Sequence, residues 1–292
     1  MKLKFWGTRG SIPVSGKQSR IFGGNTSCIE VQIDDTLLIF DAGTGLRELG
    51  ISLMGSCKPG KFEAHMFISH THWDHIQGFP YFIPAYIKGN KLTIYGSYST
   101  NNRPLEKIFR GQMDRDYFPK SLEEMSSEMI FVEIKSEKLN IGEIEVQFFY
   151  LNHPSNTLAF RVSHKGKSFV YATDHEPAAL YLHESPNSNI KTFFNSSVSF
   201  KEFIQNTDLY ICDAQYTDEE YQSHKGWGHS KLSDALNFGL ESKVKAIALF
   251  HHDPSHSDVL LKKMEKDAKQ LVKKTDPGIN VFSTYDRMEF EI

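Results

Sequence analysis

A chain of 292 residues with 39% apolar residues is long enough for one large domain or two small ones around a buried core. Its 33 Lys and Arg against 36 Asp and Glu give a formal net charge of -3, which argues against a global basic field for long nucleic acid. Three scattered cysteines without a C-x-x-C pair, an N-terminus without an apolar signal core and no apolar run of membrane length favour a cytoplasmic protein with free thiols.

Apolar runs separated by turn residues predict the strands of the first half of the chain. These strands are expected over 2–6, 26–33, 36–40, 62–69 and 91–95, with a short helix over 46–53. The strand over 36–40 is followed by Asp41, an acid that is costly to bury without a partner. We therefore expect Asp41 to orient the histidine-rich turn that follows the next strand.

That turn, Ser69-His70-Thr71-His72-Trp73-Asp74-His75, holds four potential metal ligands within six positions. His70 and His72, two apart in a turn, can face the same side, whereas Asp74 and His75 stand at a helix start. Two clusters of ligands predict two metal ions. Imidazole and carboxylate together suit zinc, manganese or iron, so ligand type alone does not choose the metal.

Two further segments of the first half are open to more than one interpretation. The aromatic-rich segment 78–86 is interpreted as core or interface, with stacking on a substrate as the alternative. The segment 104–127 is predicted to be an uneven helix broken at 117–119. It is the candidate for a lid or a dimer contact inserted into the domain.

The second half repeats the pattern of strands that end at polar residues. Alternating apolar residues over 130–134 and 144–148 predict a pair of half-buried strands. Strands over 157–162 and 168–172 are expected to pair across Gly166. Further strands are predicted over 208–212 and 246–250, and helices over 231–241 and 257–274. The lysines of the last helix are interpreted as its solvated face: Lys262, Lys263, Lys266, Lys269, Lys273 and Lys274.

Strand-rich halves that each collect helices, with potential ligands at strand ends, predict an α/β (α+β) fold. Its architecture is expected to be a four-layer αββα sandwich with two mixed sheets flanked by helices. No linker or break in composition separates the halves, so we expect residues 1–292 to form a single domain.

The ligand turn is followed along the chain by His153, Asp174 and the adjacent pair His251 and His252, each after an apolar run. This order resembles the signature of the metallo-β-lactamase-fold hydrolases. The resemblance implies one metal ion on His70, His72 and His153. It implies a second ion on Asp74, His75 and His251, with His252 as the alternative to His251, and Asp174 as the bridge between the ions.

The charge balance of such a site favours an anionic substrate. Two divalent ions bring four positive charges. Asp74, Asp174 and a bridging hydroxide each cancel one of them, so roughly one positive charge remains in the pocket. This charge suits a phosphodiester monoanion better than a neutral amide. Hydrolysis by in-line attack of metal-activated water is the expected reaction.

Two branches of this family share motifs with the chain. The stretch around Asp213, followed by Gly228-His229-Ser230, resembles ribonuclease Z-type phosphodiesterases. That resemblance implies that Asp213 supports His229, which assists at the leaving oxygen or binds the phosphate; the alternative is that His229 caps the next helix. The N-terminal segments 7–14, 23–28 and 41–47 resemble bacterial cyclic-nucleotide phosphodiesterases of the same fold. The segment 153–156 departs from that branch, where glycines are expected.

The leading hypothesis is therefore a dinuclear-metal phosphodiesterase that converts a 3′,5′-cyclic nucleotide to a nucleoside monophosphate. Its catalytic residues would be Asp74, His229 and Asp213. Its two metal ions would be zinc, with manganese or iron as alternatives. The protein would assemble as a homodimer. Arg9, Asn25 and the segment 79–86 are candidates for contact with phosphate or base. The alternative is a ribonuclease Z-like nuclease acting on RNA ends or short oligonucleotides, although the chain lacks a glycine-rich basic arm. A third hypothesis is a non-hydrolytic di-metal protein.

Overall fold

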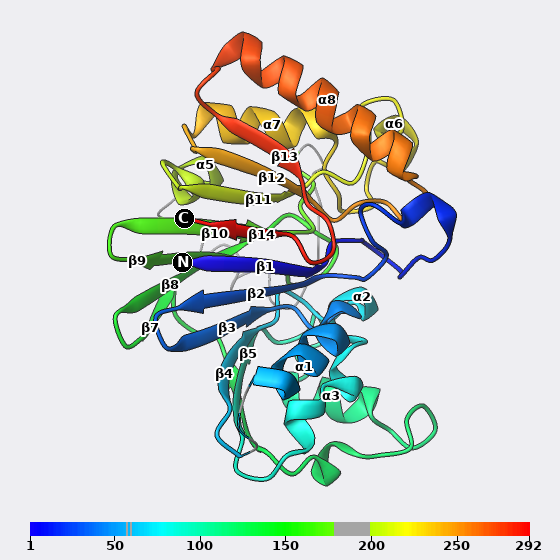
Figure 1. Ribbon diagram of the computed structural model, residues 1–292, viewed down its shortest axis with the longest axis vertical. Helices are drawn as coiled ribbons and strands as arrows, with labels where there is room; N and C mark the ends of the chain where they lie inside the picture. Colours follow the sequence, from blue (N-terminus) through cyan, green and yellow to red (C-terminus); the bar gives the residue numbers. More distant parts are fainter. Residues whose placement is uncertain (57, 59, 178–198) are drawn as a thin grey trace. The chain divides into compact units, whose positions relative to one another are not determined.

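The computed structural model of the protein describes residues 1–56, 58, 60–177 and 199–292. These residues form two compact units, each built on one seven-stranded sheet (Figure 1). The first unit comprises Met1–Val14, Gly23–Lys135 and Tyr285–Glu291. The second unit comprises Ser15–Phe22, Ser136–Thr284 and Ile292. The expectation of a single domain over 1–292 stays a prediction.

The sheet of the first unit has the strand order β14-β1-β2-β3-β4-β5-β6. Neighbouring strands are antiparallel from β14 to β3 and parallel from β3 to β6. Its strands are β1 (Lys2–Gly7), β2 (Cys28–Ile33), β3 (Thr36–Phe40), β4 (Glu63–Phe67), β5 (Lys91–Gly96), β6 (Glu128–Glu133) and β14 (Glu289–Glu291).

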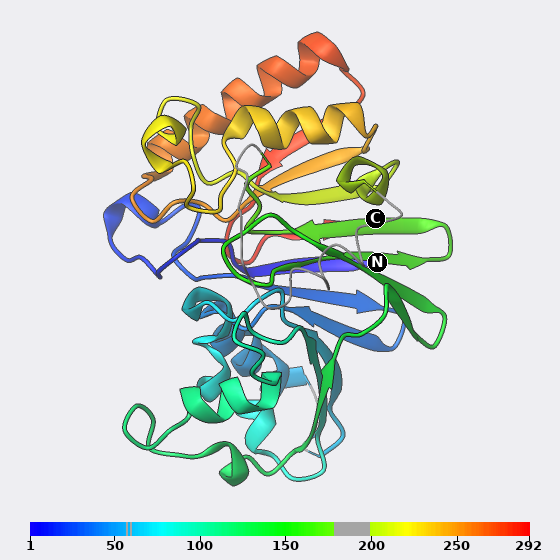
Figure 2. The same ribbon diagram turned by 180° about the vertical axis from the view of Figure 1, so that it is seen from behind.

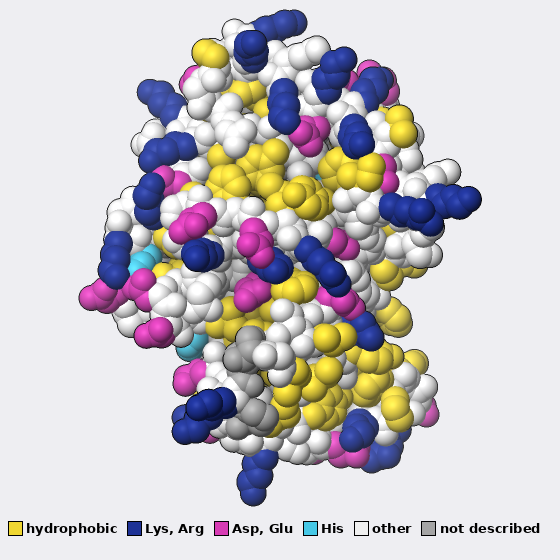
Figure 3. All heavy atoms as spheres, in the orientation of Figure 1, with side chains coloured by type: hydrophobic (Ala, Val, Ile, Leu, Met, Phe, Trp, Pro, Cys, Tyr) yellow, Lys and Arg dark blue, Asp and Glu magenta, His cyan; other side chains and the backbone are white. Residues whose placement is uncertain are grey.

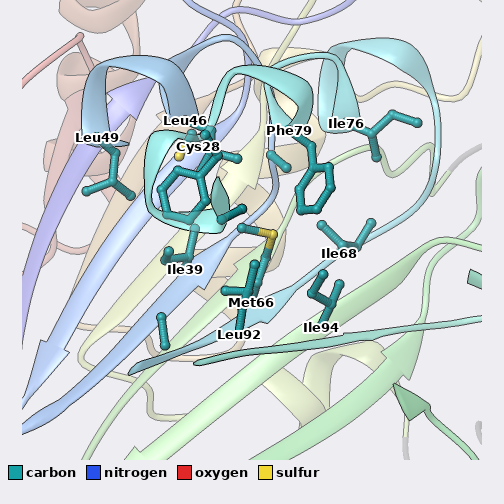
Figure 4. Packing of buried hydrophobic residues seen from close by; sticks show 14 of the residues in the cluster. Cys28, Ile39, Leu46, Leu49, Met66, Ile68, Ile76, Phe79, Leu92 and Ile94 are labelled. Carbon is teal, nitrogen blue, oxygen red and sulfur yellow. The ribbon is translucent and has the colours of Figure 1, made fainter. Parts of the chain in front are cut away.

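Short helices cover this sheet: α1 (Gly45–Ser56), α2 (Trp73–Ile76), η2 (Phe79–Tyr81), η3 (Ile83–Tyr86), α3 (Leu105–Gln112) and η4 (Leu122–Glu124). Helix α1 packs against β1, β2 and η3, and α3 packs against β6. Figure 4 shows Leu46 of α1 and Phe79 of η2 with Ile39 and Met66 of the sheet in one apolar cluster. Burial of this cluster stabilises the layer of helices on the sheet.

The aromatic-rich segment and the segment after it divide between core and surface. Phe79 and Phe82 are fully buried, as the core interpretation expects, whereas Tyr81 stays 56% exposed. In the segment 104–127 only α3 and η4 are helical, and Phe118 packs edge-on against Tyr81 with ring centroids 5.3 Å apart. A lid or dimer role for 104–127 stays a prediction.

The sheet of the second unit has the order β13-β12-β11-β10-β9-β8-β7. Neighbours are parallel from β13 to β10 and antiparallel from β10 to β7. Its strands are β7 (Lys138–Ile141), β8 (Ile144–Tyr150), β9 (Leu158–His164), β10 (Lys167–Ala172), β11 (Leu209–Asp213), β12 (Ala246–Phe250) and β13 (Asn280–Ser283). Two mixed sheets with flanking helices confirm the predicted fold class.

The described helices of the second unit are η1 (Lys17–Ser19), α5 (Phe200–Ile204), α6 (Tyr221–His224), α7 (Leu232–Glu241) and α8 (Asp258–Thr275). Figures 1 and 2 both show α7 beside α8; α7 packs on β11 and β12, and α8 on β13. The six lysines of α8 are all exposed, as expected, and basic side chains project over this helix in Figure 3. Within the described part of the chain, no helix combines the length and apolarity needed to cross a bilayer.

The predicted pairing of the strand over 130–134 with the strand over 144–148 is wrong. Strand β6 is the edge of the first sheet and pairs in parallel with β5, whereas β8 lies in the second sheet between β7 and β9. The reason is an unpredicted strand, β7, which folds back on β8 through Gly142. Gly142 has a φ of 57°, a conformation that glycine adopts without strain.

Candidate metal centre

The predicted site residues lie at the carboxyl ends of strands in both sheets. In the first unit, Asp41 follows β3 and the ligand turn 69–75 follows β4, its parallel neighbour. In the second unit, Asp174 follows β10, Asp213 ends β11 and His251 follows β12. Because parallel strands end at one edge of a sheet, each unit gathers its polar residues at a single edge.

Three of these residues have backbone conformations that are uncommon outside glycine. The φ angles of Asp41, Asp174 and His251 are 59°, 55° and 60°. A left-handed residue directly after a strand turns the chain sharply and costs conformational energy of about 1 kcal/mol or more. Such strain is often retained at functional sites, and here it occurs at three strand ends that carry polar side chains.

In the first unit, Asp41 organises the ligand turn. One carboxylate oxygen of Asp41 accepts the backbone N–H of Ser69 at 2.7 Å, and the other accepts the Ser69 hydroxyl at 2.8 Å. The second oxygen also lies 2.8 Å from Nδ1 of His75. With Nδ1 occupied in this way, Nε2 of His75 faces Asp74 at 3.2 Å.

The four predicted ligands of the turn lie close together in the first unit. The ring centroid of His70 is 4.5 Å from that of His72 and 4.2 Å from that of His75. His70, Asp74 and His75 are buried, whereas His72, at the N-cap of α2, is exposed. Asp74 also accepts the backbone N–H of Ser11 at 2.7 Å, which ties the turn to the loop after β1.

In the second unit, two buried histidines face Asp174. Nε2 of His251 lies 3.3 Å from one oxygen of Asp174, and Nε2 of His153 lies 3.8 Å from the other. Nδ1 of His251 is bonded to the side-chain oxygen of Gln215 at 2.9 Å, and Nδ1 of His153 to the carbonyl of Gly228 at 2.8 Å. An acceptor at Nδ1 fixes the tautomer in which Nε2 carries the lone pair.

His252 occupies a different environment from His251. Its Nε2 is 2.8 Å from the carbonyl oxygen of Thr284, and its ring packs edge-on against Phe22. The Nε2 atom of His252 is therefore engaged by a backbone carbonyl of the second unit. The geometry therefore favours His251 over His252 as the last ligand.

The predicted pair of His229 and Asp213 is adjacent in space. Nδ1 of His229 lies 2.9 Å from Asp213 and 3.8 Å from Asp174, and its ring stacks on that of His251. Asp213 also accepts the backbone N–H groups of His175 and Gln215. The alternative role of His229 as a helix cap is wrong, because the N-cap of α7 is Lys231.

The donor set suits divalent metal ions. Within the second unit, ligand atoms of Asp174, His229 and His251 lie within 4.8 Å of one another. His75, His153 and His251 all use Nδ1 for an orienting bond and turn Nε2 toward a carboxylate, the arrangement of metal-binding histidines. The His and Asp clusters are consistent with a dinuclear metal site, and their imidazole and carboxylate donors suit zinc.

Arg9 and Asn25, predicted to contact phosphate or base, are held by neighbours in the first unit. Arg9 is fully buried and donates from Nε to the carbonyl of Gly23 at 3.0 Å. Asn25 donates from its side chain to Asp286 at 3.1 Å. Burial raises the pKa of Asp286 to about 6, against the effect of the N–H donors of Gly24 and Asn25. Substrate contact by Arg9 or Asn25 stays a prediction.

The sequence did not single out Ser69, Gln215, Gly228 or Glu176 as residues that orient the ligands. Each of them makes a hydrogen bond to a residue distant in the sequence, and Gly228 makes it through its backbone. One signal was available for Glu176. An acid two residues after the strand-end Asp174 has to find partners if it is buried, and Glu176 is fully buried.

Comparison with known proteins gives a consistent picture. A family model described as the beta-lactamase superfamily domain matches residues 36–252, which include every predicted metal ligand. Ribonuclease Z from Staphylococcus carnosus is 25% identical over 86% of this chain and 88% of its own length. Among solved structures, the metallo-β-lactamase fold protein YhfI from Bacillus subtilis has a TM-score of 0.67 at 18% identity, covering 100% of this chain and 98% of its own. Human tRNase Z, short form, has a TM-score of 0.62 at 19% identity, and the match covers 100% of this chain and 99% of the human chain. At these identities the structural likeness is one of fold.

Proposed function

Because this chain belongs to the β-lactamase superfamily and has the metallo-β-lactamase fold, we propose that it is a metal-dependent phosphodiesterase. The observation that carries the proposal is the His229–Asp213 pair, 2.9 Å apart and beside Asp174. A metal-binding protein without hydrolytic activity would not need a carboxylate-supported histidine next to its ligands. The pair therefore favours a hydrolase over the non-hydrolytic hypothesis.

The proposed centre takes its ligands from positions 70 to 251 of the chain. His70, His72 and His153 would hold one divalent ion, Asp74, His75 and His251 would hold the other, and Asp174 would contribute to both. Support comes from the Nε2 orientation of the buried histidines and from the family match, which spans both ligand sets. Zinc is the proposed ion, and manganese or iron would satisfy the same donors. When bound, such ions would activate water for attack and neutralise charge on phosphoryl oxygens.

The residues of the chain supply the proton chemistry. Asp213 holds Nδ1 of His229, which orients the ring and stabilises its protonated form. Histidine is easily protonated near neutral pH, so His229 can donate a proton from Nε2 to the leaving oxygen. A leaving alkoxide protonated in this way departs as a neutral hydroxyl group.

For the substrate we propose a phosphodiester of RNA, at an RNA end or in a short oligonucleotide. The support is the similarity to ribonuclease Z, which covers 86% of the chain at 25% identity. The comparisons give less support to a 3′,5′-cyclic nucleotide, the hypothesis that the N-terminal motifs favoured. The net charge of -3 and the lack of a glycine-rich basic arm keep a small substrate as the second candidate.

The first experiment tests the phosphodiesterase proposal itself. Protein loaded with zinc, manganese or iron is expected to hydrolyse bis(p-nitrophenyl) phosphate, with metal content measured on the same samples. A protein that binds two ions and turns over none of this ester with any of the three metals would contradict the proposal.

The second experiment separates the two substrate classes. A short single-stranded RNA and 3′,5′-cyclic AMP are compared at equal concentration across a range of salt. If RNA is the substrate, kcat/KM for RNA exceeds that for cyclic AMP and falls as salt rises, because phosphate contacts release counterions. Faster turnover of cyclic AMP with a weak salt dependence would instead establish the second candidate.

A further inference from the structure

Glu176 is a buried carboxylate that the proposed chemistry does not use. It is fully buried and lies two residues after Asp174. Its backbone is fixed to Asn152, because its N–H donates to the Asn152 carbonyl at 2.9 Å and its carbonyl accepts the Asn152 side-chain amide at 2.6 Å. The side chain of Glu176 therefore projects from a rigid turn.

The carboxylate of Glu176 receives three hydrogen bonds from one loop and its helix. One oxygen accepts the Tyr221 hydroxyl at 2.7 Å and the backbone N–H of Gly226 at 2.9 Å. The other oxygen accepts the backbone N–H of Gly228 at 2.7 Å. The positive φ angles of Gly226 and Gly228, 87° and 95°, belong to the loop conformation that brings both N–H groups to one carboxylate.

The same loop determines the positions of two site histidines. The carbonyl of Gly228 accepts Nδ1–H of His153 at 2.8 Å, so this loop sets the tautomer and ring orientation of His153. His229 follows Gly228 directly, and its Nδ1 lies 2.9 Å from Asp213. A displacement of Gly228 would move both a proposed metal ligand and the proposed proton donor.

We propose that Glu176 is a positioning residue that holds the 226–228 loop and, through it, aligns His153 and His229 for reaction. The inference rests on the proposed function for the roles of those two histidines. Glu176 touches neither substrate nor metal in this proposal. Its substitution is expected to lower kcat rather than substrate binding, because it misplaces groups that act in the transition state.

The test uses Glu176→Gln in the full-length, zinc-loaded protein. The amide group of glutamine places N–H donors against either Gly228 or the Gly226–Tyr221 pair, so at least one bond is lost. We expect kcat for bis(p-nitrophenyl) phosphate to fall by about tenfold or more, with KM changed by less than about threefold. We also expect amide exchange at Gly226 and Gly228 to become about tenfold faster, while exchange in β11 stays unchanged.

Asp208→Asn is the matched control. Asp208 is also a buried carboxylate that accepts a backbone N–H, that of Ser168 at 2.9 Å, but it lies at the opposite end of β11 from Asp213. This variant should alter neither kcat nor exchange in the 226–228 loop. If Glu176→Gln does not fold, Glu176→Asp carries the same test, because a carboxylate one methylene shorter cannot reach both amides.

Parent-like kcat in either Glu176 variant, or unchanged exchange at Gly226 and Gly228, would overturn the proposal. A parent protein that hydrolyses no phosphodiester would overturn the proposed function instead. In that case the Nδ1–H resonance of His153 in ¹⁵N NMR still tests the loop. Its loss in Glu176→Gln supports the positioning role toward His153, and its retention contradicts it.

Discussion

Three buried histidines of the proposed centre, His75, His153 and His251, each make an orienting bond at Nδ1 while Nε2 faces a carboxylate. The partners of Nδ1 differ: His75 contacts a carboxylate, His153 a backbone carbonyl and His251 the oxygen of a side-chain amide. Such orienting partners typically change metal affinity by about 10–100-fold when removed. Metal binding at the proposed site is therefore expected to depend on residues that are not ligands themselves.

The proposed ligand and the proposed proton donor should respond differently to truncation. Asp74→Ala removes a carboxylate ligand, so we expect a lowered metal content together with loss of measurable turnover. His229→Ala leaves the ligands intact, so both ions should remain while kcat falls by about 10²–10⁴-fold. Metal analysis and steady-state kinetics on the same preparations check both outcomes. Loss of metal in His229→Ala would show that His229 is a ligand.

His175 is expected to make stability depend on pH. Burial among aromatic rings lowers its pKa to about 4, from an ordinary value of 6.5, and its Nδ1 accepts the backbone N–H of Asn152. As pH falls below 6.5, the unfolded chain takes up a proton at His175 before the folded chain does. The contribution of neutral His175 to the free energy of unfolding is therefore fully present above pH 6.5. It is lost as the pH falls from 6.5 to about 4, and it amounts to on the order of 3 kcal/mol.

The check is urea unfolding of metal-free protein at several pH values, with His175→Gln as the comparison. Glutamine can accept the Asn152 N–H but does not titrate. The free energy of unfolding of the parent should fall more steeply with acid than that of the variant. Parallel curves would mean that His175 does not contribute to the pH dependence.

The residues of the site were predictable to different degrees. Asp41, Asp174 and Asp213 follow apolar runs, so strand-end position and the cost of burying a carboxylate point to them. The partners Gln215 and Glu176 are set by contacts between segments far apart in the chain, such as Glu176 with Gly228. A linear pattern carries no information on such pairs.

At the scale of single elements, the 226–228 loop provides a paired prediction. A Cβ at Gly228 would lie 2.3 Å from Nδ1 of His153, whereas a Cβ at Gly226 would meet nothing within 4 Å. Both glycines have positive φ, so alanine costs a similar backbone strain of about 1–2 kcal/mol at either position.

We therefore expect Gly228→Ala to weaken zinc binding by about tenfold or more, because it displaces His153 from its orienting carbonyl. Gly226→Ala should have a clearly smaller effect. Zinc affinity is measured by competition with a chelating dye, and thermal unfolding reports the shared backbone cost. Equal losses of affinity in the two variants would show that strain, not the contact with His153, dominates.

The helices and strands with a strong apolar periodicity were predicted from the sequence. The strands that exist only because they pair with a neighbouring strand were not. Strand β12 and the buried stripe of α8 follow local pattern, and both occur close to their expected bounds. Strands β7 and β14 have four and three residues, with little burial, and exist because a neighbouring strand pairs with them. The error over β6 and β8 has the same origin, since two alternating segments do not reveal their sheet partners.

At the scale of the whole molecule, the ligands of the proposed centre are spread along the sequence from His70 to His251. Zinc is therefore expected to raise the stability of the folded protein. At a free concentration about 100-fold above Kd, each bound ion adds about 2.7 kcal/mol, which corresponds to roughly 5 °C in Tm per ion for a chain of this size.

Hydrogen exchange followed by mass spectrometry checks this expectation. Zinc should slow exchange in peptides covering the ligand turn after β4 and in peptides covering the end of β12, and a chelator should reverse both effects. Protection confined to one of these segments would contradict the proposed set of ligands.

The strand β14 has a consequence for how the chain is made. It pairs with β1, with Lys2 opposite Glu291 and Lys4 bonded to Glu289 at 2.8 Å. During synthesis on the ribosome, β1 (Lys2–Gly7) emerges long before its outer neighbour β14 (Glu289–Glu291), because the two strands lie far apart in the sequence. Until then β1 is an open edge that can pair with another nascent chain, so premature termination near residue 285 would leave a sheet prone to aggregation.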